Sequence, residues 1–255
     1  MTVLLETRGV SRSFGAFRAL AGVNIAIGED EVVSVVGPNG AGKTTLVNTL
    51  TGLLPPTSGQ VMFKGRCIAG LGPVRLAEQG LVRSFQLIEI FPALTVAETI
   101  AAAVISRQKK RWRPFWPVAG DAAIGDRVRE VAGIFGLTGR LDAVAGALSQ
   151  GEKKLLDVAS AFALDPQVIL LDEPTSGVST AEKHDIMRTL TAAGRQAGVK
   201  AIVLVEHDMD LVAAYSSRIV ALSGGEVIAD LAPERFFADP HLVATVVGKR
   251  SRHQG

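Results

Sequence analysis

The sequence predicts an α/β domain that is built on a mostly parallel sheet and carries an inserted helical subdomain. Short apolar segments alternate with Gly-containing turns and helical patterns along most of the 255 residues, which is the order of elements in parallel α/β sheets. The runs Val168–Leu171 and Ala201–Val205 are apolar throughout, as expected of central strands that are buried on both faces. Residues from about 88 to 164 show no convincing strand pattern, so the helical subdomain is expected there.

The individual elements follow from the spacing of apolar residues between Gly- and Pro-containing turns. Strands are expected near residues 3–8, 22–27, 32–36, 60–63, 81–84, 168–171, 201–205 and 218–222. Helices are expected near residues 43–52, 95–106, 126–136, 150–164, 181–197, 208–215 and 233–238, with a short last helix after Pro240. The basic and aromatic segment 107–117 is expected to be a loop, because its prolines break a helix.

Composition narrows the class of protein. The net charge of +2 gives no electrostatic signal for nucleic acid, so no nucleic-acid partner is expected. A single cysteine, Cys67, excludes an internal disulfide and fits a reducing cytoplasm. The segment Met1–Glu6 lacks the basic flank and long apolar core of a signal peptide, and no apolar run is long enough for a membrane span.

A Gly-rich loop directly follows the apolar run Val32–Val36 and precedes a helical pattern. Its nine residues are Gly37, Pro38, Asn39, Gly40, Ala41, Gly42, Lys43, Thr44 and Thr45. Glycines at this spacing allow successive backbone N–H groups to point at an anion, and Lys43 places a positive charge toward the outer phosphates. The Thr44 hydroxyl can bind Mg²⁺. The loop therefore predicts binding of a nucleoside triphosphate with magnesium.

Two carboxylates, Asp172 and Glu173, follow the apolar strand Val168–Leu171. Because the carboxyl ends of strands in α/β sheets converge on the ligand crevice, these side chains are expected near the phosphates. Asp172 can hold Mg²⁺ directly or through water, and Glu173 can polarise the water that attacks the γ-phosphate. Alone, the same pattern also fits a strand followed by an acidic helix cap; the phosphate-binding loop favours the catalytic interpretation.

Together with these two motifs, the segment Leu148-Ser149-Gln150-Gly151-Glu152 resembles the signature motif of the nucleotide-binding subunits of ABC transporters. The resemblance covers nearly the whole chain and implies the ABC ATPase fold for residues 1–255. It implies a nucleotide-binding α/β core over residues 1–87 and 165–255, with an N-terminal antiparallel β subdomain. The helical subdomain with the signature motif is then expected over residues 88–164.

The signature motif also has a local interpretation. Ser149 fits a helix N-cap, with Glu152 at the capping-box position. In the family, this helix end contacts the γ-phosphate of ATP bound by the other subunit. Ser149, Gly151 and Glu152 are thus expected to contact ATP, and the resemblance implies a head-to-tail dimer, either of two copies or with a related ATPase, that holds two ATP molecules.

Further residues match family positions and receive their roles from the resemblance. Gln86 resembles the Q-loop glutamine that senses Mg²⁺ and the attacking water, and His207 resembles the switch histidine that contacts the γ-phosphate. Phe14 resembles the aromatic residue that stacks on adenine. The catalytic set is therefore expected to be Glu173, His207 and Lys43, and the metal set Thr44, Gln86 and Asp172. Each of these three residues also has an ordinary structural interpretation when it is taken singly. Gln86 fits a loop amide, His207 a helix-capping or core histidine, and Phe14 a core aromatic residue.

Three positions depart from the family pattern. Gln150 stands where the signature usually has glycine, Glu152 where glutamine is common, and Ser179 where the D-loop often ends in aspartate. Ser149 and Gly151, which carry the phosphate contacts in the family, are retained. We expect a functional ATPase with altered coupling between subunits.

The sequence around Gln86, from Gly80 to Glu98, is similar to the corresponding segment of the ATPases of branched-chain amino acid importers. The resemblance implies separate membrane permease subunits, an extracytoplasmic substrate-binding protein as an indirect partner, and a peripheral location on the cytoplasmic face of the inner or plasma membrane. Segment 107–117 would face the permease and lipid headgroups, or would simply be a solvated loop. Two alternatives stay open at this point: an ATPase for lipid or polysaccharide export, and a soluble ABC-type ATPase that acts on nucleic acid or ribosomes.

Overall fold

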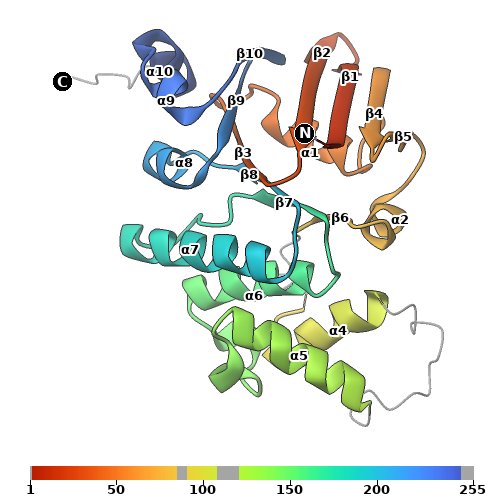
Figure 1. Ribbon diagram of the computed structural model, residues 1–255, viewed down its shortest axis with the longest axis vertical. Coiled ribbons are helices and arrows are strands. Elements are labelled where there is room, and N and C mark those ends of the chain that lie inside the picture. The colour runs from red at the N-terminus through yellow and green to blue at the C-terminus, as the bar shows by residue number, and fades with distance from the viewer. Residues whose placement is uncertain (1, 85–90, 108–120, 248–255) are drawn as a thin grey trace. The chain divides into compact units, whose positions relative to one another are not determined.

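The computed structural model describes residues 2–84, 91–107 and 121–247, and the chain forms two compact units (Figure 1). The first unit contains residues 1–76 and 201–255, and the second contains residues 77–200. These bounds differ from the expected subdomains, because two strands and a long helix group with the helical residues in the second unit. The subdomain boundaries at 88 and 164 stay a prediction.

An antiparallel sheet forms the N-terminal part of the first unit, as expected. Its strand order is β2-β1-β4-β5, and its strands are β1 (Val3–Phe14), β2 (Phe17–Gly28), β4 (Ser58–Phe63) and β5 (Arg66–Cys67). β1 and β2 each have 12 residues and are longer than expected, because bulges let the pairing continue past polar positions. Apolar residues of these strands, such as Leu5, Val10 and Ile25, are buried.

The first unit also contains the parallel strands that carry the phosphate-binding loop. They are β3 (Glu31–Val36), β8 (Ala201–Val205) and β9 (Arg218–Ser223), in the order β9-β3-β8. All five residues of β8 are buried, which explains its continuous apolar run. A hairpin adds the antiparallel edge strand β10 (Glu226–Leu231), which the sequence analysis missed because its half-exposed residues do not form an apolar run.

The helices of the first unit are short. They are α1 (Lys43–Leu50), α8 (Met209–Tyr215), α9 (Pro233–Phe237) and α10 (Pro240–Val247), while α2 (Pro73–Glu78) crosses from the first unit into the second along the chain. The last three in sequence, α8 to α10, pack on β9 and β10 around the fully buried Phe236. The helix α2 was missed by the sequence analysis, because a single buried residue, Leu76, gives it no periodic pattern.

The second unit combines one parallel strand pair with a group of helices (Figure 1). β6 (Leu81–Arg83) pairs in parallel with β7 (Val168–Asp172). The main helices are α4 (Val96–Arg107), α5 (Ala122–Ile134), α6 (Gln150–Phe162) and α7 (Thr180–Gln196), with 3₁₀ turns at Thr138–Arg140 and Ala145–Ala147. Phe135 and Phe162 join α5 and α6 through an edge-to-face contact of 5.1 Å between ring centroids. Among the described residues from 91 to 164 there is no strand, as predicted, only an isolated bridge between Thr95 and Val144.

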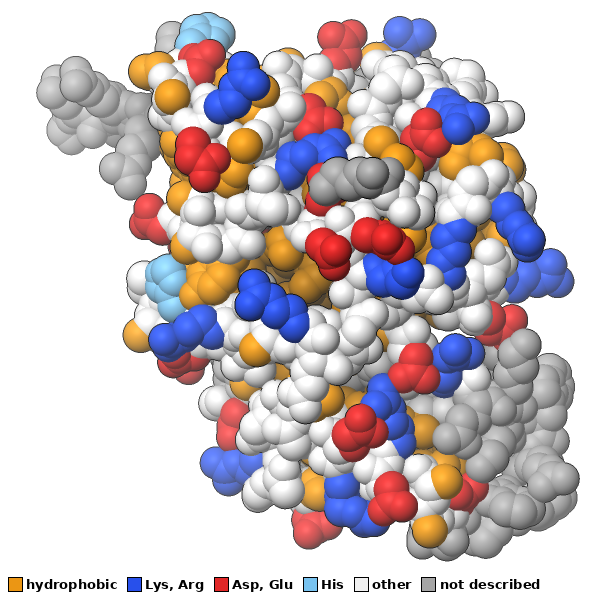
Figure 2. Space-filling model, viewed as in Figure 1, with side chains coloured by type: hydrophobic (Ala, Val, Ile, Leu, Met, Phe, Trp, Pro, Cys, Tyr) orange, Lys and Arg blue, Asp and Glu red, His pale blue; other side chains and the backbone are white. Residues whose placement is uncertain are grey.

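Charged side chains are dispersed over the surface in view. Figure 2 shows Lys and Arg side chains interleaved with Asp and Glu, so the described residues on this face form no continuous basic patch. None of the helices among the described residues combines the length and the apolar composition needed to cross a membrane.

Candidate functional site

The phosphate-binding loop connects the buried strand β3 to helix α1, and backbone crowding dictates its glycines. A Cβ on Gly37 would lie 2.3 Å from the Leu222 carbonyl oxygen, and one on Gly42 would lie 2.5 Å from the Ala19 carbonyl oxygen. Real Cβ atoms essentially never come within 3.0 Å of a neighbouring atom, so a side chain at either position would clash. The loop is therefore held between β9 and β2, and only glycine fits at its two ends.

Lys43 is the first residue of α1, and its side chain turns back into the loop. The residue is 7% exposed. Its Nζ donates hydrogen bonds to the carbonyl oxygens of Gly37 at 2.7 Å and Pro38 at 3.0 Å. Thr44, the next residue, is exposed. The helix N-terminus, the loop N–H groups and a buried ammonium group together form an anion site of the kind that binds phosphates.

His207 leaves the sheet at the same edge as the phosphate-binding loop. Val205 on β8 is paired with Val35 on β3, and His207 and Gly37 each lie two residues beyond those partners. The strands are parallel, so both segments emerge from their carboxyl ends. His207 is exposed, whereas its neighbour Glu206 is 4% exposed. The structure thus brings His207 to the loop edge, where its predicted contact with a γ-phosphate requires it.

Phe14 lies at the end of β1, in the tip of the β1–β2 hairpin. It is 45% exposed and is paired with Phe17, which is 63% exposed. The Arg12 guanidinium lies 4.7 Å from the centre of the Phe14 ring. Ala19, two residues after Phe17, contacts the loop at Gly42. β2 therefore passes close to the phosphate-binding loop shortly after the hairpin tip, where an exposed aromatic ring can stack on a base.

In the second unit, Asp172 ends β7 and pairs with an arginine from the neighbouring strand. The Arg83 Nη2 atom donates to Asp172 Oδ2 at 2.7 Å, and the two side chains are 13% and 24% exposed. Arg83 was not among the predicted site residues. Its charge within the apolar strand before Gln86 was the one sequence feature that could have indicated a role. Its partner lies 89 positions away and could be found only from the strand pairing.

Glu173 adopts a left-handed backbone conformation with φ 48°. Residues other than Gly, Asn and Asp seldom adopt this region, and such strain is concentrated at functional sites. The Glu173 carbonyl oxygen accepts a hydrogen bond from the Ser176 N–H at 3.1 Å, which closes a turn around the buried Pro174 and Thr175. The turn fixes the direction in which the Glu173 side chain leaves the strand.

The capping box predicted at the signature motif is present at the start of α6. The Ser149 Oγ accepts from the Glu152 N–H at 3.2 Å, and the Glu152 carboxylate accepts from the Ser149 N–H at 2.9 Å. Arg140 Nε also donates to this carboxylate at 2.8 Å. The hydrogen bond from the Ser149 N–H, followed by those from the Ser149 hydroxyl and Arg140, lowers the pKa of Glu152. A glutamate at this position is thus held as an anion on the helix N-terminus.

The stability that Glu152 contributes should depend on pH. A carboxyl group whose pKa is lowered by folding stabilises the protein fully above its ordinary pKa of 4.5 and loses that contribution as the pH falls through the folded-state pKa. We expect Glu152→Gln to reduce the free energy of unfolding by about 0.5 kcal/mol at pH 7, because the Arg140 partner is mostly exposed. Urea unfolding from pH 7 downward measures this difference. A difference that does not shrink below pH 4.5 would contradict the assignment, and Glu130→Gln on the surface of α5 serves as the control.

The residues at the D-loop position, Ser176 to Ser179, end in a helix cap and are linked to α6, the helix that begins at the signature motif. Ser179 caps α7, and the Glu182 carboxylate completes a second capping box. A serine therefore replaces the family's aspartate without loss of the helix cap. Lys154 on α6 donates to the Ser176 hydroxyl at 2.9 Å. This contact links α6 to the D-loop within one chain, and it joins residues too far apart in sequence for a local pattern to predict.

The predicted site residues fall into two sets, one in each unit. The first unit holds the phosphate-binding loop, Phe14 and His207, and the second holds Asp172, Glu173 and the signature residues. Gln86 and most of segment 107–117 lie outside the described residues. The roles of all these residues in binding and catalysis stay predictions.

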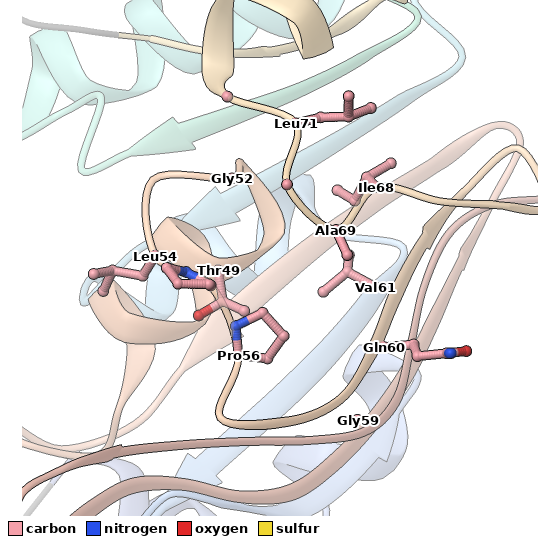
Figure 3. Close-up of a pocket in the computed structure, with 13 residues that line it drawn as sticks. Thr49, Gly52, Leu54, Pro56, Gly59, Gln60, Val61, Ile68, Ala69 and Leu71 are labelled. Carbon is pink, nitrogen blue, oxygen red and sulfur yellow. The ribbon is translucent and has the colours of Figure 1, made fainter.

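A separate cavity of about 250 Å³ lies beyond the end of α1 in the first unit (Figure 3). Its walls are mostly apolar and include Leu54, Pro56, Val61, Ile68 and Leu71. None of the predicted site residues lines it. None of the described lysines and arginines lines it, so it is a different site from the proposed nucleotide site.

The donor groups of the predicted site residues suit a nucleoside triphosphate and a magnesium ion. The phosphate-binding loop and Lys43 supply N–H and ammonium donors for phosphate. Each unit also holds a hard oxygen donor of the kind that Mg²⁺ prefers: the Thr44 hydroxyl in the first and the Asp172 carboxylate in the second. No group of three or more His, Cys, Asp or Glu side chains gathers into a metal cage in the described part of the chain. Mg²⁺ is commonly held instead by one or two carboxylates together with substrate phosphates.

The fold and the phosphate-binding loop define a P-loop ATPase. The sequence model of the family described as ABC transporter matches residues 20–176, which is more than half of the chain. The chain belongs to the ABC transporter family, and its fold is that of the family's ATPase cassettes, as the sequence predicted.

Named relatives match over nearly their full length. The chain is 32% identical to the high-affinity branched-chain amino acid transport ATP-binding protein BraF of Pseudomonas aeruginosa, over 96% of this chain and 98% of the relative. It is equally similar to LivG of Escherichia coli K12, which has the same description. Among solved structures, the ADP conformation of MJ1267, an ATP-binding cassette of an ABC transporter, is 29% identical with a TM-score of 0.84, covering 98% of this chain and 100% of that one.

Proposed function

We propose that the chain is the ATP-hydrolysing subunit of an importer for branched-chain or other hydrophobic amino acids. One observation carries the ATPase assignment: a glycine-restricted loop that encloses the buried Lys43 ammonium group. The cargo assignment is supported by BraF and LivG, whose descriptions name branched-chain amino acid transport. The ATPase works at the cytoplasmic face of the membrane, attached to separate permease subunits.

The proposed reaction begins when ATP places its phosphates in the loop and its adenine on Phe14. Lys43 exchanges its carbonyl partners for phosphate oxygens, which neutralises charge that develops at the γ-phosphate. Thr44, Asp172 and Gln86 would hold Mg²⁺, which supplies further neutralisation of the phosphates when bound. Glu173 accepts the proton of the attacking water, and His207 contacts the γ-phosphate at the loop edge.

The proposed assembly contains two ATPases, either two copies of this chain or one copy with a related ATPase. Ser149, Gly151 and Glu152 at the start of α6 present a helix N-terminus to the ATP held by the partner, in keeping with the affinity of such ends for anions. Closure of the dimer around two ATP molecules would move the permease subunits, and hydrolysis would reopen the dimer.

We expect the chain to co-purify with the other subunits of an importer. A tagged Glu173→Gln chain, purified from native membranes in mild detergent with Mg-ATP, should bring down two polytopic membrane proteins and an ATPase partner, as identified by mass spectrometry. Cells without the chain should take up less radiolabelled leucine. Co-purification of ribosomal or DNA-associated proteins would overturn the transport assignment. Co-purification of the membrane proteins of a lipid or polysaccharide exporter would show that the chain drives export and not import. The Lys43→Ala chain is the control for complexes that form only with ATP.

A further inference from the structure

The ion pair between Arg83 and Asp172 in the second unit has no role in the function described so far. β6 and β7 run in parallel with Arg83 opposite Leu170, and the Ser84 N–H donates to the Leu170 carbonyl oxygen at 3.0 Å. This register brings Arg83 alongside the last residue of β7. Its Nη2 then reaches Asp172 Oδ2 at 2.7 Å.

The pair differs from the exposed ion pairs of the chain. The Arg83 side chain is 13% exposed, whereas that of Arg129, paired with Asp126, is 62% exposed. Withdrawing a guanidinium and a carboxylate from water is costly, and such a pair seldom stabilises a fold more than apolar side chains would. A contribution to the function of Asp172 is therefore a better account of Arg83 than stability alone.

We propose that Arg83 is a positioning residue for the magnesium site. The ion pair holds Oδ2 of Asp172, which leaves Oδ1 to face the metal. Hydrogen-bonding partners of metal-binding carboxylates orient the ligand, and their removal typically weakens metal affinity 10- to 100-fold. The inference rests on the proposed function, in which Asp172 is the metal carboxylate, and it adds that the strand before Gln86 orients that carboxylate.

Binding of Mn²⁺ as a spectroscopic substitute for Mg²⁺ tests the inference without relying on turnover. The full chain is saturated with the non-hydrolysable nucleotide AMP-PNP, and free Mn²⁺ is followed by its EPR signal, with AMP-PNP alone as the baseline. We expect Arg83→Met to weaken Mn²⁺ binding to the complex about 10-fold or more. Affinity for AMP-PNP in EDTA should stay within about twofold, since Arg83 does not contact the phosphate-binding loop in the proposal. Arg129→Met, which removes an exposed arginine from α5, should change neither value.

Two more variants separate the possible outcomes. Arg83→Lys keeps the charge but loses the planar fork, so Mn²⁺ affinity should fall by a smaller factor; this variant decides the question if Arg83→Met does not fold. In an Asp172→Asn background, Arg83→Met should have no further effect.

Unchanged or tighter Mn²⁺ binding in both Arg83 variants would overturn the inference, and tighter binding would show that Arg83 repels the metal. If Asp172→Asn itself binds Mn²⁺ as the parent does, Asp172 is not the metal carboxylate and this part of the proposed function fails too. If Asp172→Asn weakens binding and the Arg83 variants do not, only the role of Arg83 is lost.

Discussion

Glu173→Gln should reduce ATP turnover about 10³-fold while leaving ATP affinity within about twofold of the parent. The substitution removes the proposed proton acceptor but keeps the size of the side chain. It also keeps the left-handed backbone at φ 48° that the parent already tolerates, so the turn to Ser176 should persist. Phosphate release at saturating ATP measures turnover, and fluorescence titration with a labelled nucleotide measures affinity.

The control for Glu173→Gln is Glu130→Gln, which removes a 58% exposed carboxylate from α5 and should turn over ATP at the parent rate. A second result should accompany the loss of turnover. Because ATP binds but is not hydrolysed, the closed dimer should accumulate with Mg-ATP and elute earlier on size exclusion when the proper partner is present. If Glu173→Gln hydrolyses ATP at the parent rate, Glu173 is not the base.

Lys43→Ala should weaken ATP binding about 100-fold. A hydrogen bond to a charged group contributes about 1.5–3 kcal/mol, and each 1.4 kcal/mol is a tenfold change in affinity. The free loop will lose stability as well, because the carbonyl groups of Gly37 and Pro38 lose the donor that satisfies them. Nucleotide titration and thermal unfolding of the nucleotide-free chain measure the two effects.

Two comparisons make the Lys43 experiment specific. Lys43→Met keeps most of the buried side-chain volume, so it separates loss of charge from loss of packing. Lys200→Ala removes an exposed lysine just before β8 and should leave ATP affinity unchanged. Parent-like affinity in both Lys43 variants would contradict the assignment of this loop as the nucleotide site.

Much of the fold could be predicted because its signals are local. Buried strands such as β8 are continuous apolar runs, and the capping box at Ser149 involves residues only three apart. Elements without such a pattern were missed. β10 lies at a sheet edge with half-exposed residues, β5 has two exposed residues, and α2 buries only Leu76.

The candidate site likewise has features that local sequence encodes and features that depend on the tertiary structure. The sequence alone determined where an anion can bind, because the glycine spacing and Lys43 are encoded within nine consecutive residues. It also determined the position of the helix cap at the signature motif. Only the tertiary structure decided that Leu222 and Ala19 crowd the loop glycines, that His207 leaves β8 beside the loop, and that Arg83 pairs with Asp172. These contacts join residues that are far apart in sequence. They depend on which strands pair and in which register, and no local pattern of side chains encodes that pairing.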